Sequence, residues 1–184
     1  MYRRALALAV LLIPASAIAE LSRWRIDSAR SEAYFQVTLR VPIKAEGRFK
    51  TIEGDVNALP DMKRNVRVRL NARELSMGGP AWVQGATESE PFLDTRHYPK
   101  IIFESADFSE QVMTSGGEIK GILTIKDTSR PVVFIVAQAS CRRPGFSCPI
   151  NVSGTLNRRD FNMNAYRWSL KDEIRFQFQL KFIE

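Results

Sequence analysis

The chain has 184 residues, of which 45% are hydrophobic and 26% are charged, and its formal net charge is +7. This length is that of one domain large enough to bury its own core. One histidine and two cysteines argue against a bound metal. Beyond residue 19 no stretch approaches about 18 uncharged apolar residues, so we expect no membrane-spanning helix there and a soluble mature protein.

The first 19 residues have the parts of a secretory signal peptide. The basic start "MYRR" precedes the apolar run "ALALAVLLIPA", and Ala17-Ile18-Ala19 forms a small-x-small cleavage site. We predict cleavage before Glu20 and one domain over residues 20–184, with an uncleaved membrane anchor as the alternative. Export argues against a nucleic-acid partner. The positive charge has two interpretations: a solvated surface, or transient contact with an anionic membrane surface or phosphate head group.

Alternation of apolar and polar residues with a period of two predicts β-strands along most of the chain. In the last of them, an isoleucine, three phenylalanines and a leucine share one face between Ile174 and Phe182. Glycines interrupt the second, which indicates a bend or bulge. The predicted strands cover residues 31–41, 47–56, 66–75, 100–108, 118–127, 131–139, 150–160 and 168–182.

The segment 79–100 lacks this alternation and predicts a short helix, whose length Pro91 and Pro99 limit. Two aromatic residues in it, Trp82 and Phe92, have two interpretations. They either form part of a lid over the interior of the fold or simply close the hydrophobic core.

Cys141 and Cys148, in "CRRPGFSC", are predicted to form a disulfide across the base of a hairpin loop. Export places them in an oxidising compartment, and Arg-Pro-Gly between them favours a turn. Their spacing is not Cys-x-x-Cys, so a redox or metal role is the weaker interpretation.

His97 and the run Arg158-Arg159-Asp160 are interpreted as surface features. Catalysis by His97 requires a nucleophile or base as partner, and no serine lies in a Gly-x-Ser-x-Gly motif. The Arg158 run is expected to form exposed ion pairs that contribute little stability.

About eight antiparallel strands with little helix leave two architectures, a sandwich and an up-and-down barrel. The long strands, above all 168–182, favour the barrel. Periodicity does not distinguish a self-packed interior from a hollow one, because both need an apolar inward face.

Six elements of the sequence resemble, in order, those of the YceI-like, polyisoprenoid-binding family of exported bacterial proteins. They are "WRIDSARSEAYFQV" (24–37), "GRFKTIEGDV" (47–56), "FLDTRHYPKIIFES" (92–105), "GILTIKDTSRPVVFIV" (121–136), "LNRRDFNM" (156–163) and Asp172 at the start of the last strand. One departure is Arg30, which stands where the family usually has a histidine.

The resemblance implies an all-β, eight-stranded antiparallel lipocalin-like β-barrel with one or two short helices. Its interior would hold an isoprenoid chain, such as a quinone tail or polyprenyl phosphate, with no catalysis and no resident cofactor. The implied location is the periplasm, and the implied state is a monomer or homodimer. The residues then expected to bind the ligand are Phe35, Val37, Phe49, Ile101, Phe103, Leu123, Ile125, Phe134, Phe176, Phe178, Leu180, Trp82, Phe92 and Arg30.

Two other functions remain open. One is an enzyme, such as an isomerase or hydratase, acting on a hydrophobic substrate in the same pocket; it needs a buried ionisable group there. The other is a ligand-free structural or stress-related interaction module. Arg30 is expected to contact a phosphorylated head group, because a guanidinium binds phosphate well.

Overall fold

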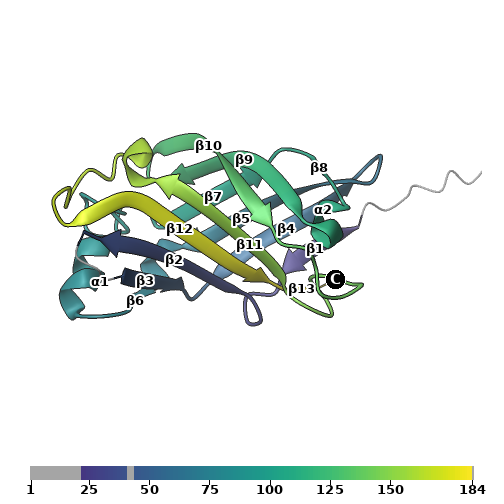
Figure 1. Ribbon diagram of the computed structural model, residues 1–184, viewed down its shortest axis with the longest axis horizontal. Helices are drawn as coiled ribbons and strands as arrows, with labels where there is room; N and C mark the ends of the chain where they lie inside the picture. Colours follow the sequence, from purple (N-terminus) through teal and green to yellow (C-terminus); the bar gives the residue numbers. More distant parts are fainter. Residues whose placement is uncertain (1–21, 41–43, 184) are drawn as a thin grey trace, which may run out of the picture.

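The computed structural model describes residues 22–40 and 44–183 (Figure 1). The predicted signal peptide and Val41 lie outside the described residues. Within them the chain forms thirteen strands and four short helices. The strands are β1 (Arg23–Ile26), β2 (Glu32–Leu39), β3 (Lys44–Phe49), β4 (Ile52–Leu59), β5 (Lys63–Asn71), β6 (Leu75–Met77), β7 (Lys100–Ser105), β8 (Phe108–Ser109), β9 (Gly117–Ile125), β10 (Thr128–Val136), β11 (Ile150–Asn157), β12 (Leu170–Leu180) and β13 (Phe182–Ile183). The α-helices are α1 (Ala81–Glu88) and α2 (Val112–Ser115), and the 3₁₀-helices are η1 (Ala72–Glu74) and η2 (Arg158–Phe161).

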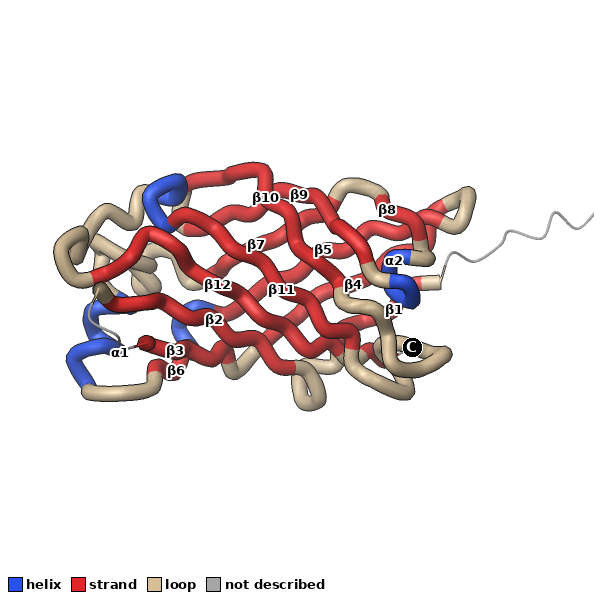
Figure 2. Tube along the Cα trace, viewed as in Figure 1, coloured by secondary structure: helices blue, strands red, loops and turns tan. Residues whose placement is uncertain are grey.

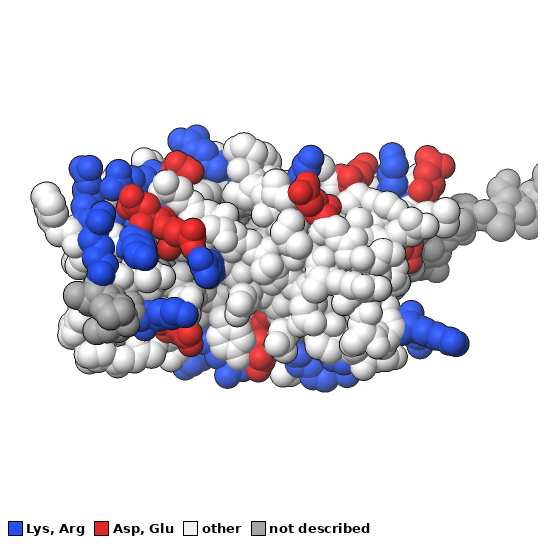
Figure 3. All heavy atoms as spheres, in the orientation of Figure 1, with Lys and Arg blue, Asp and Glu red and all other residues white. Residues whose placement is uncertain are grey.

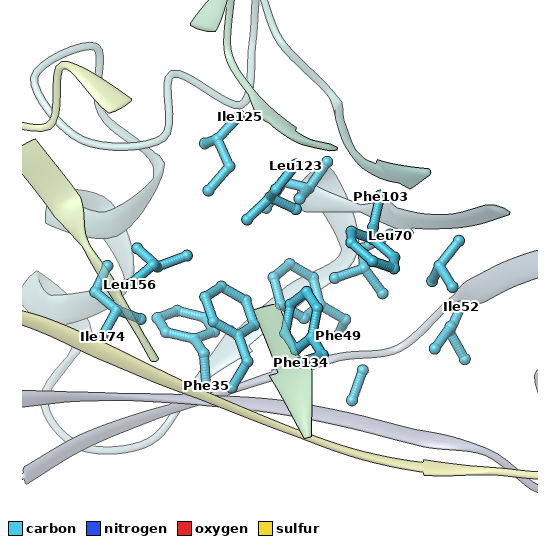
Figure 4. Packing of buried hydrophobic residues seen from close by; sticks show 14 of the residues in the cluster. Phe35, Phe49, Ile52, Leu70, Phe103, Leu123, Ile125, Phe134, Leu156 and Ile174 are labelled. Carbon is cyan, nitrogen blue, oxygen red and sulfur yellow. The ribbon is translucent and has the colours of Figure 1, made fainter. Parts of the chain in front are cut away.

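Burial follows the predicted alternation. In β2 the side chains of Ala33, Phe35 and Val37 are buried, and the residues between them are partly exposed. In β12 the buried side chains include Ile174 and Phe176. These strands thus turn one apolar face inward, as expected for a sheet whose other face is exposed to solvent. Figure 4 shows buried side chains from several strands, Phe35 and Ile174 among them, pointing into a common interior.

The strands form one curled antiparallel sheet that closes on itself. Five pairs of segments continue one another across a kink or short break: β1 with β2, β3 with β4, β5 with β6, β7 with β8 and β12 with β13. Counted in this way there are eight strands, each paired with its neighbour in the chain. The first and last also pair, because β2 lies beside β12 and β1 beside β13. The predicted all-β, lipocalin-like barrel is confirmed, although its strands are more divided than expected.

Side chains from the β1–β2 turn connect the kinks of three neighbouring strands. The backbone N–H of Ile52, where β4 begins, donates to Ser28 Oγ at 3.1 Å. The backbone N–H of Lys181, between β12 and β13, donates to Ser31 Oγ at 2.9 Å. The kinks therefore lie side by side across the sheet, where the barrel wall changes direction.

Several predicted strand boundaries were wrong, and the predicted strands 66–75 and 150–160 run into the 3₁₀-helices η1 and η2. The last strand begins at Leu170 and breaks at Lys181, and Trp168 lies in the preceding turn with 95% of its surface exposed. The break in segment 47–56 falls at Lys50 and Thr51 and not at a glycine. Gly47 and its neighbours instead continue β3.

The barrel has two dissimilar ends (Figure 2). The predicted helix is confirmed as α1, which packs against β6 at one end, called here the α1 end. At the other, the α2 end, α2 packs against β9 and the loop 137–149 folds over β13. That loop contains the predicted Cys141–Cys148 disulfide, which is confirmed with a Cα–Cα distance of 6.0 Å. In the described part of the chain, no helix is long and apolar enough to cross a membrane.

Candidate functional site

An apolar cavity, called here the first, lies inside the half of the barrel toward the α2 end. Its volume is about 70 Å³, and its walls come from β4, β5 and β7 to β13, with one residue of α2. Every described side chain that lines it is hydrophobic. A space of this size would admit several water molecules, but an all-hydrophobic wall offers them no hydrogen bonds. The first cavity is therefore suited to an apolar guest.

A second cavity, of about 60 Å³, lies at the α1 end. Helix α1 forms one wall with Trp82, Val83 and Ala86, and Val37 and Leu39 of β2 contribute to another. Three side chains with a hydroxyl group, those of Thr87, Tyr166 and Ser169, also line it. This cavity sits where the barrel is closed by α1 and not by strands.

Phenylalanine rings fill the space between these two cavities. Phe35 packs against Phe49 and Phe176 with ring centroids 5.6 and 6.0 Å apart. Phe134 lies edge-on to Phe103 at 4.9 Å and to Phe178 at 5.7 Å. Such tilted and edge-to-face pairs are favourable arrangements. The rings form an aromatic layer across the middle of the barrel, part of which is labelled in Figure 4.

A third cavity, of about 10 Å³, lies within this layer. It shares Ile101 and Phe176 with the first cavity and Phe92 with the second. The three cavities therefore follow one another through the barrel interior. Each is far below the roughly 300–1,000 Å³ of a typical ligand pocket, so a long ligand could enter only if aromatic side chains moved aside.

All but one of the residues predicted to bind the ligand line one of these cavities. The first is lined by Ile101, Phe103, Leu123, Phe134, Phe176, Phe178 and Leu180. The second is lined by Val37, Trp82 and Phe92, and the third by Phe35, Phe49 and Ile125. Their contact with a ligand remains a prediction.

Arg30 is the exception, because it lines none of these cavities. It lies in the exposed β1–β2 turn, where its Nε pairs with Asp27 and its Nη2 donates to the carbonyl oxygen of Phe182 at 3.4 Å. The hydrogen bond from Arg30 lowers the pKa of Asp27 below its usual value. The geometry thus gives Arg30 a role in the turn and does not bring it to the apolar interior.

Trp82 and Phe92 differ in position, although the same two interpretations, lid or closure of the core, were open for both from the sequence. Phe92 is only 3% exposed and lines both the second and third cavities. Trp82 is 64% exposed and contributes only to the outer wall of the second. Phe92 therefore closes the core, and only Trp82 occupies the position that a lid residue requires.

Two buried arginines escaped the sequence analysis. Arg158 was expected at the surface but is fully buried, which corrects that prediction. Its guanidinium donates to the carbonyl oxygens of Met163, Ala165 and Lys171 and pairs with Asp172 at 3.2 Å. Burial lowers the pKa of Arg158, and Asp172 opposes that effect.

The second is Arg64, near the start of β5 and 4% exposed. The sequence contained a signal for it: Arg64 continues backward the inward-facing series of Val66, Val68 and Leu70. The predicted strand began at Val66 and therefore did not include Arg64.

Other chemistry-bearing groups lie outside the cavities. His97 is exposed on a turn and hydrogen-bonds through Nδ1 to Asp94 at 2.9 Å. Across residues 22–40 and 44–183, no cluster of three His, Cys, Asp or Glu side chains could hold a metal ion. On the surface seen in Figure 3, basic side chains gather toward the α1 end with acidic ones among them.

The fold and its cavities define a small, lipocalin-like antiparallel β-barrel protein with an apolar interior. The sequence matches the model of the YceI-like domain over residues 24–182, and the chain belongs to this family. The family resemblance inferred from the sequence is thereby confirmed.

Three solved structures share the fold. BcnA from Burkholderia cenocepacia is 20% identical with a TM-score of 0.68, over 86% of this chain and 99% of that chain. A polyisoprenoid-binding domain from Saccharophagus degradans, implicated in plant cell wall breakdown, is 11% identical with a TM-score of 0.64, over 88% and 98%. A YceI protein from Campylobacter jejuni is 18% identical with a TM-score of 0.55, over 75% and 84%. Comparison with curated protein sequences gives no match.

Proposed function

We propose that this protein binds a long apolar lipid of the isoprenoid class in its barrel and carries it in the periplasm. The observation that carries the proposal is the succession of three apolar cavities through the barrel interior, the first walled entirely by hydrophobic side chains. The family membership and the polyisoprenoid-binding domain among the similar structures support the same ligand class.

The energetics favour a hydrocarbon chain over a polar guest. Burial of apolar surface contributes about 25 cal/mol per Å², whereas an unpaired polar group in the same place costs several kcal/mol. Part of the gain must offset the displacement of the aromatic layer, because the cavities are small. The expected ligand is therefore flexible and slender, and the barrel widens around it.

Transport is proposed over catalysis because of what lines the interior. An enzyme of the isomerase or hydratase type needs a proton donor or acceptor at the substrate. The described side chains around the first and third cavities are all hydrophobic. The periplasmic location rests on the predicted signal peptide alone.

The direct test is native mass spectrometry of the secreted protein, followed by organic extraction and identification of any released lipid. After delipidation, uptake of geranylgeraniol is measured by titration. We expect a stoichiometric isoprenoid in the first experiment and saturable uptake in the second. A protein that carries nothing and takes up no probe would contradict the proposal.

A matched pair of variants locates the binding in the barrel. Val66 lines the first cavity, whereas Val133 on β10 points outward and is exposed. Val66→Phe fills the cavity and is expected to weaken uptake of geranylgeraniol at least tenfold. Val133→Phe adds the same volume outside and is expected to leave uptake unchanged. Equal effects of both changes would argue against an interior site.

A further inference from the structure

Arg64 is a buried cation whose side chain is only partly bonded. Its position in β5 places it on the inward face, two residues before Val66. Only 4% of its surface is exposed. Its Nε and Nη1 atoms have no hydrogen-bond partner among the described residues. Because a guanidinium carries five N–H groups, at least three of them are left for an acceptor.

The groups around Arg64 hold it in place without using those donors. The indole ring of Trp24 stacks on the guanidinium, with Cζ 3.6 Å from the ring centroid. Glu110 pairs with Nη2 at 3.2 Å from a partly exposed position at the surface. Stacking and one ion pair fix the plane of the guanidinium, and its Nε and Nη1 sides are left buried and unpaired.

Arg64 lies at the α2 end of the first cavity. Its neighbour in the sheet is Phe108, which lines that cavity. Trp24, on which Arg64 stacks, packs in turn against Phe182, another lining residue. The guanidinium is thus one side chain away from the apolar space, beside the rim where Glu110 reaches solvent.

We propose that Arg64 binds the head group of the carried lipid through phosphate oxygens, while the chain of the lipid extends into the first cavity. This inference rests on the proposed function and adds which end of the barrel receives the polar group. An unpaired donor buried beside a cavity costs free energy that an acceptor oxygen would recover. An anionic oxygen recovers most, because hydrogen bonds from a guanidinium to an anion are charge-assisted.

The proposal fixes the orientation of the ligand. A phosphate could not cross the aromatic layer without losing its hydration in an apolar space. The hydrocarbon therefore enters first, past Trp24 and Phe146, whose rings pack edge-to-face at 5.2 Å. Phe146 belongs to the disulfide-bearing loop 137–149, so this loop covers the place where the head group comes to rest.

The test compares probes that share a chain and differ in the head group. The delipidated protein is titrated with geranylgeranyl phosphate, geranylgeraniol and inorganic phosphate. In Arg64→Met, whose folding is verified by circular dichroism, we expect affinity for geranylgeranyl phosphate to fall about 10- to 100-fold. Affinity for geranylgeraniol is expected to change less than about threefold, since a neutral hydroxyl makes a weaker bond. Equal losses for both lipids, or no loss for the phosphate, would overturn the proposal.

A second variant keeps the test decisive if Arg64→Met does not fold. Glu110→Gln removes the carboxylate that competes for Arg64 and changes only a partly exposed residue. We expect it to raise the affinity for geranylgeranyl phosphate about two- to fivefold and to leave the affinity for geranylgeraniol unchanged. An unchanged or lower affinity for the phosphate would count against the head-group site.

The remaining outcomes separate the two proposals. If the wild-type protein takes up neither lipid, the carrier function itself fails. If it takes up both lipids but neither variant distinguishes them, only the role of Arg64 fails. Inorganic phosphate is expected to bind at least tenfold more weakly than the lipid phosphate; equal binding would mean a site for free phosphate and would also overturn the proposal.

Discussion

Ser31 and Lys181 exchange hydrogen bonds although they are 150 positions apart: the backbone N–H of Lys181 donates to Ser31 Oγ at 2.9 Å, and Ser31 Oγ donates to the carbonyl oxygen of Lys181 at 3.3 Å. Ser31 directly precedes β2, and Lys181 separates β12 from β13. One hydroxyl therefore satisfies the backbone at the kink of the last strand and fastens that strand to the first.

Replacing Ser31 with alanine should weaken this junction. The N–H of Lys181 would lose its acceptor in a partly buried place, which costs about 1–3 kcal/mol. The carbonyl oxygen of Lys181 would keep the hydrogen bond from the N–H of Asp27. The free energy of unfolding, from urea titration, measures the loss. Ser153→Ala, on the exposed face of β11, is the control and should stay within about 0.5 kcal/mol. Equal stability of the two variants would show that the junction contributes nothing.

Gly47 should not tolerate a side chain. A Cβ atom there would lie 2.3 Å from the ring of Phe35 and 2.6 Å from Sδ of Met77, so the aromatic layer would have to shift. We expect Gly47→Ala to lower the free energy of unfolding by about 1–3 kcal/mol.

Gly85 provides the matched control. It lies in α1, and a Cβ atom there has no heavy atom within 4 Å. Gly85→Ala should therefore raise stability by up to about 1 kcal/mol through helix propensity. A stable Gly47→Ala protein with unchanged melting temperature would contradict the close packing of β3 on Phe35.

Arg158 and Arg159 both pair with Asp172, at 3.2 and 2.8 Å, but differ in burial. Arg158→Ala would leave Asp172 without its buried partner and three carbonyl oxygens without a donor, so we expect a loss of about 3–5 kcal/mol. Arg159 is 39% exposed, and Arg159→Ala should cost less than about 1 kcal/mol. Chemical denaturation of both proteins distinguishes a buried network from a surface pair, and similar losses would refute the distinction.

Acid should weaken the β1–β4 contact. The hydrogen bond and charge of Arg23 lower the pKa of Asp55, and Arg30 lowers that of Asp27 in the same way. A carboxyl whose pKa is lowered on folding makes its full contribution to stability when the pH is above its ordinary pKa of about 3.9. That contribution is lost as the pH falls from the ordinary pKa through the lower pKa of the folded protein. Stability measured from pH 7 to pH 3 should therefore fall at the acid end.

Asp55→Asn tests this contribution. It should lower the stability at pH 7 and make the decline of stability toward acid pH shallower. Asp27 should still contribute to the decline that remains. Asp107→Asn, in the exposed segment between β7 and β8, should leave the stability at pH 7 and the acid-side decline unchanged. A decline as steep in Asp55→Asn as in the wild type would exclude a role for this pair.

Alternation predicted the strands and the inward faces well, because one residue of slip would turn every buried side chain outward. It did not predict the kinks. These depend on single hydrogen bonds, such as that from Ile52 to Ser28, between segments distant in sequence. The division of β12 from β13 was missed for the same reason.

The candidate site was predicted in composition but not in shape. Phe35, Phe134 and Phe176 were correctly expected to point inward, but only packing shows that their rings separate the interior into small cavities. Arg64 and Arg158 were missed because charged residues usually lie at the surface. Their burial depends on partners, Trp24 for Arg64 and the carbonyl oxygens of Met163, Ala165 and Lys171 for Arg158, that no local pattern reveals.

The pairing of β2 with β12 also orders events in time. As the chain emerges from its N-terminal end, β2 can pair with β3 early, but its other edge and the apolar face around Phe35 remain uncovered until residues 170–180 follow. Contacts between such distant segments form slowly, and unpaired strand edges promote aggregation while they wait. The nascent chain is thus most vulnerable just before its final strand is made, and a chaperone that shields β2 until then would protect the whole barrel.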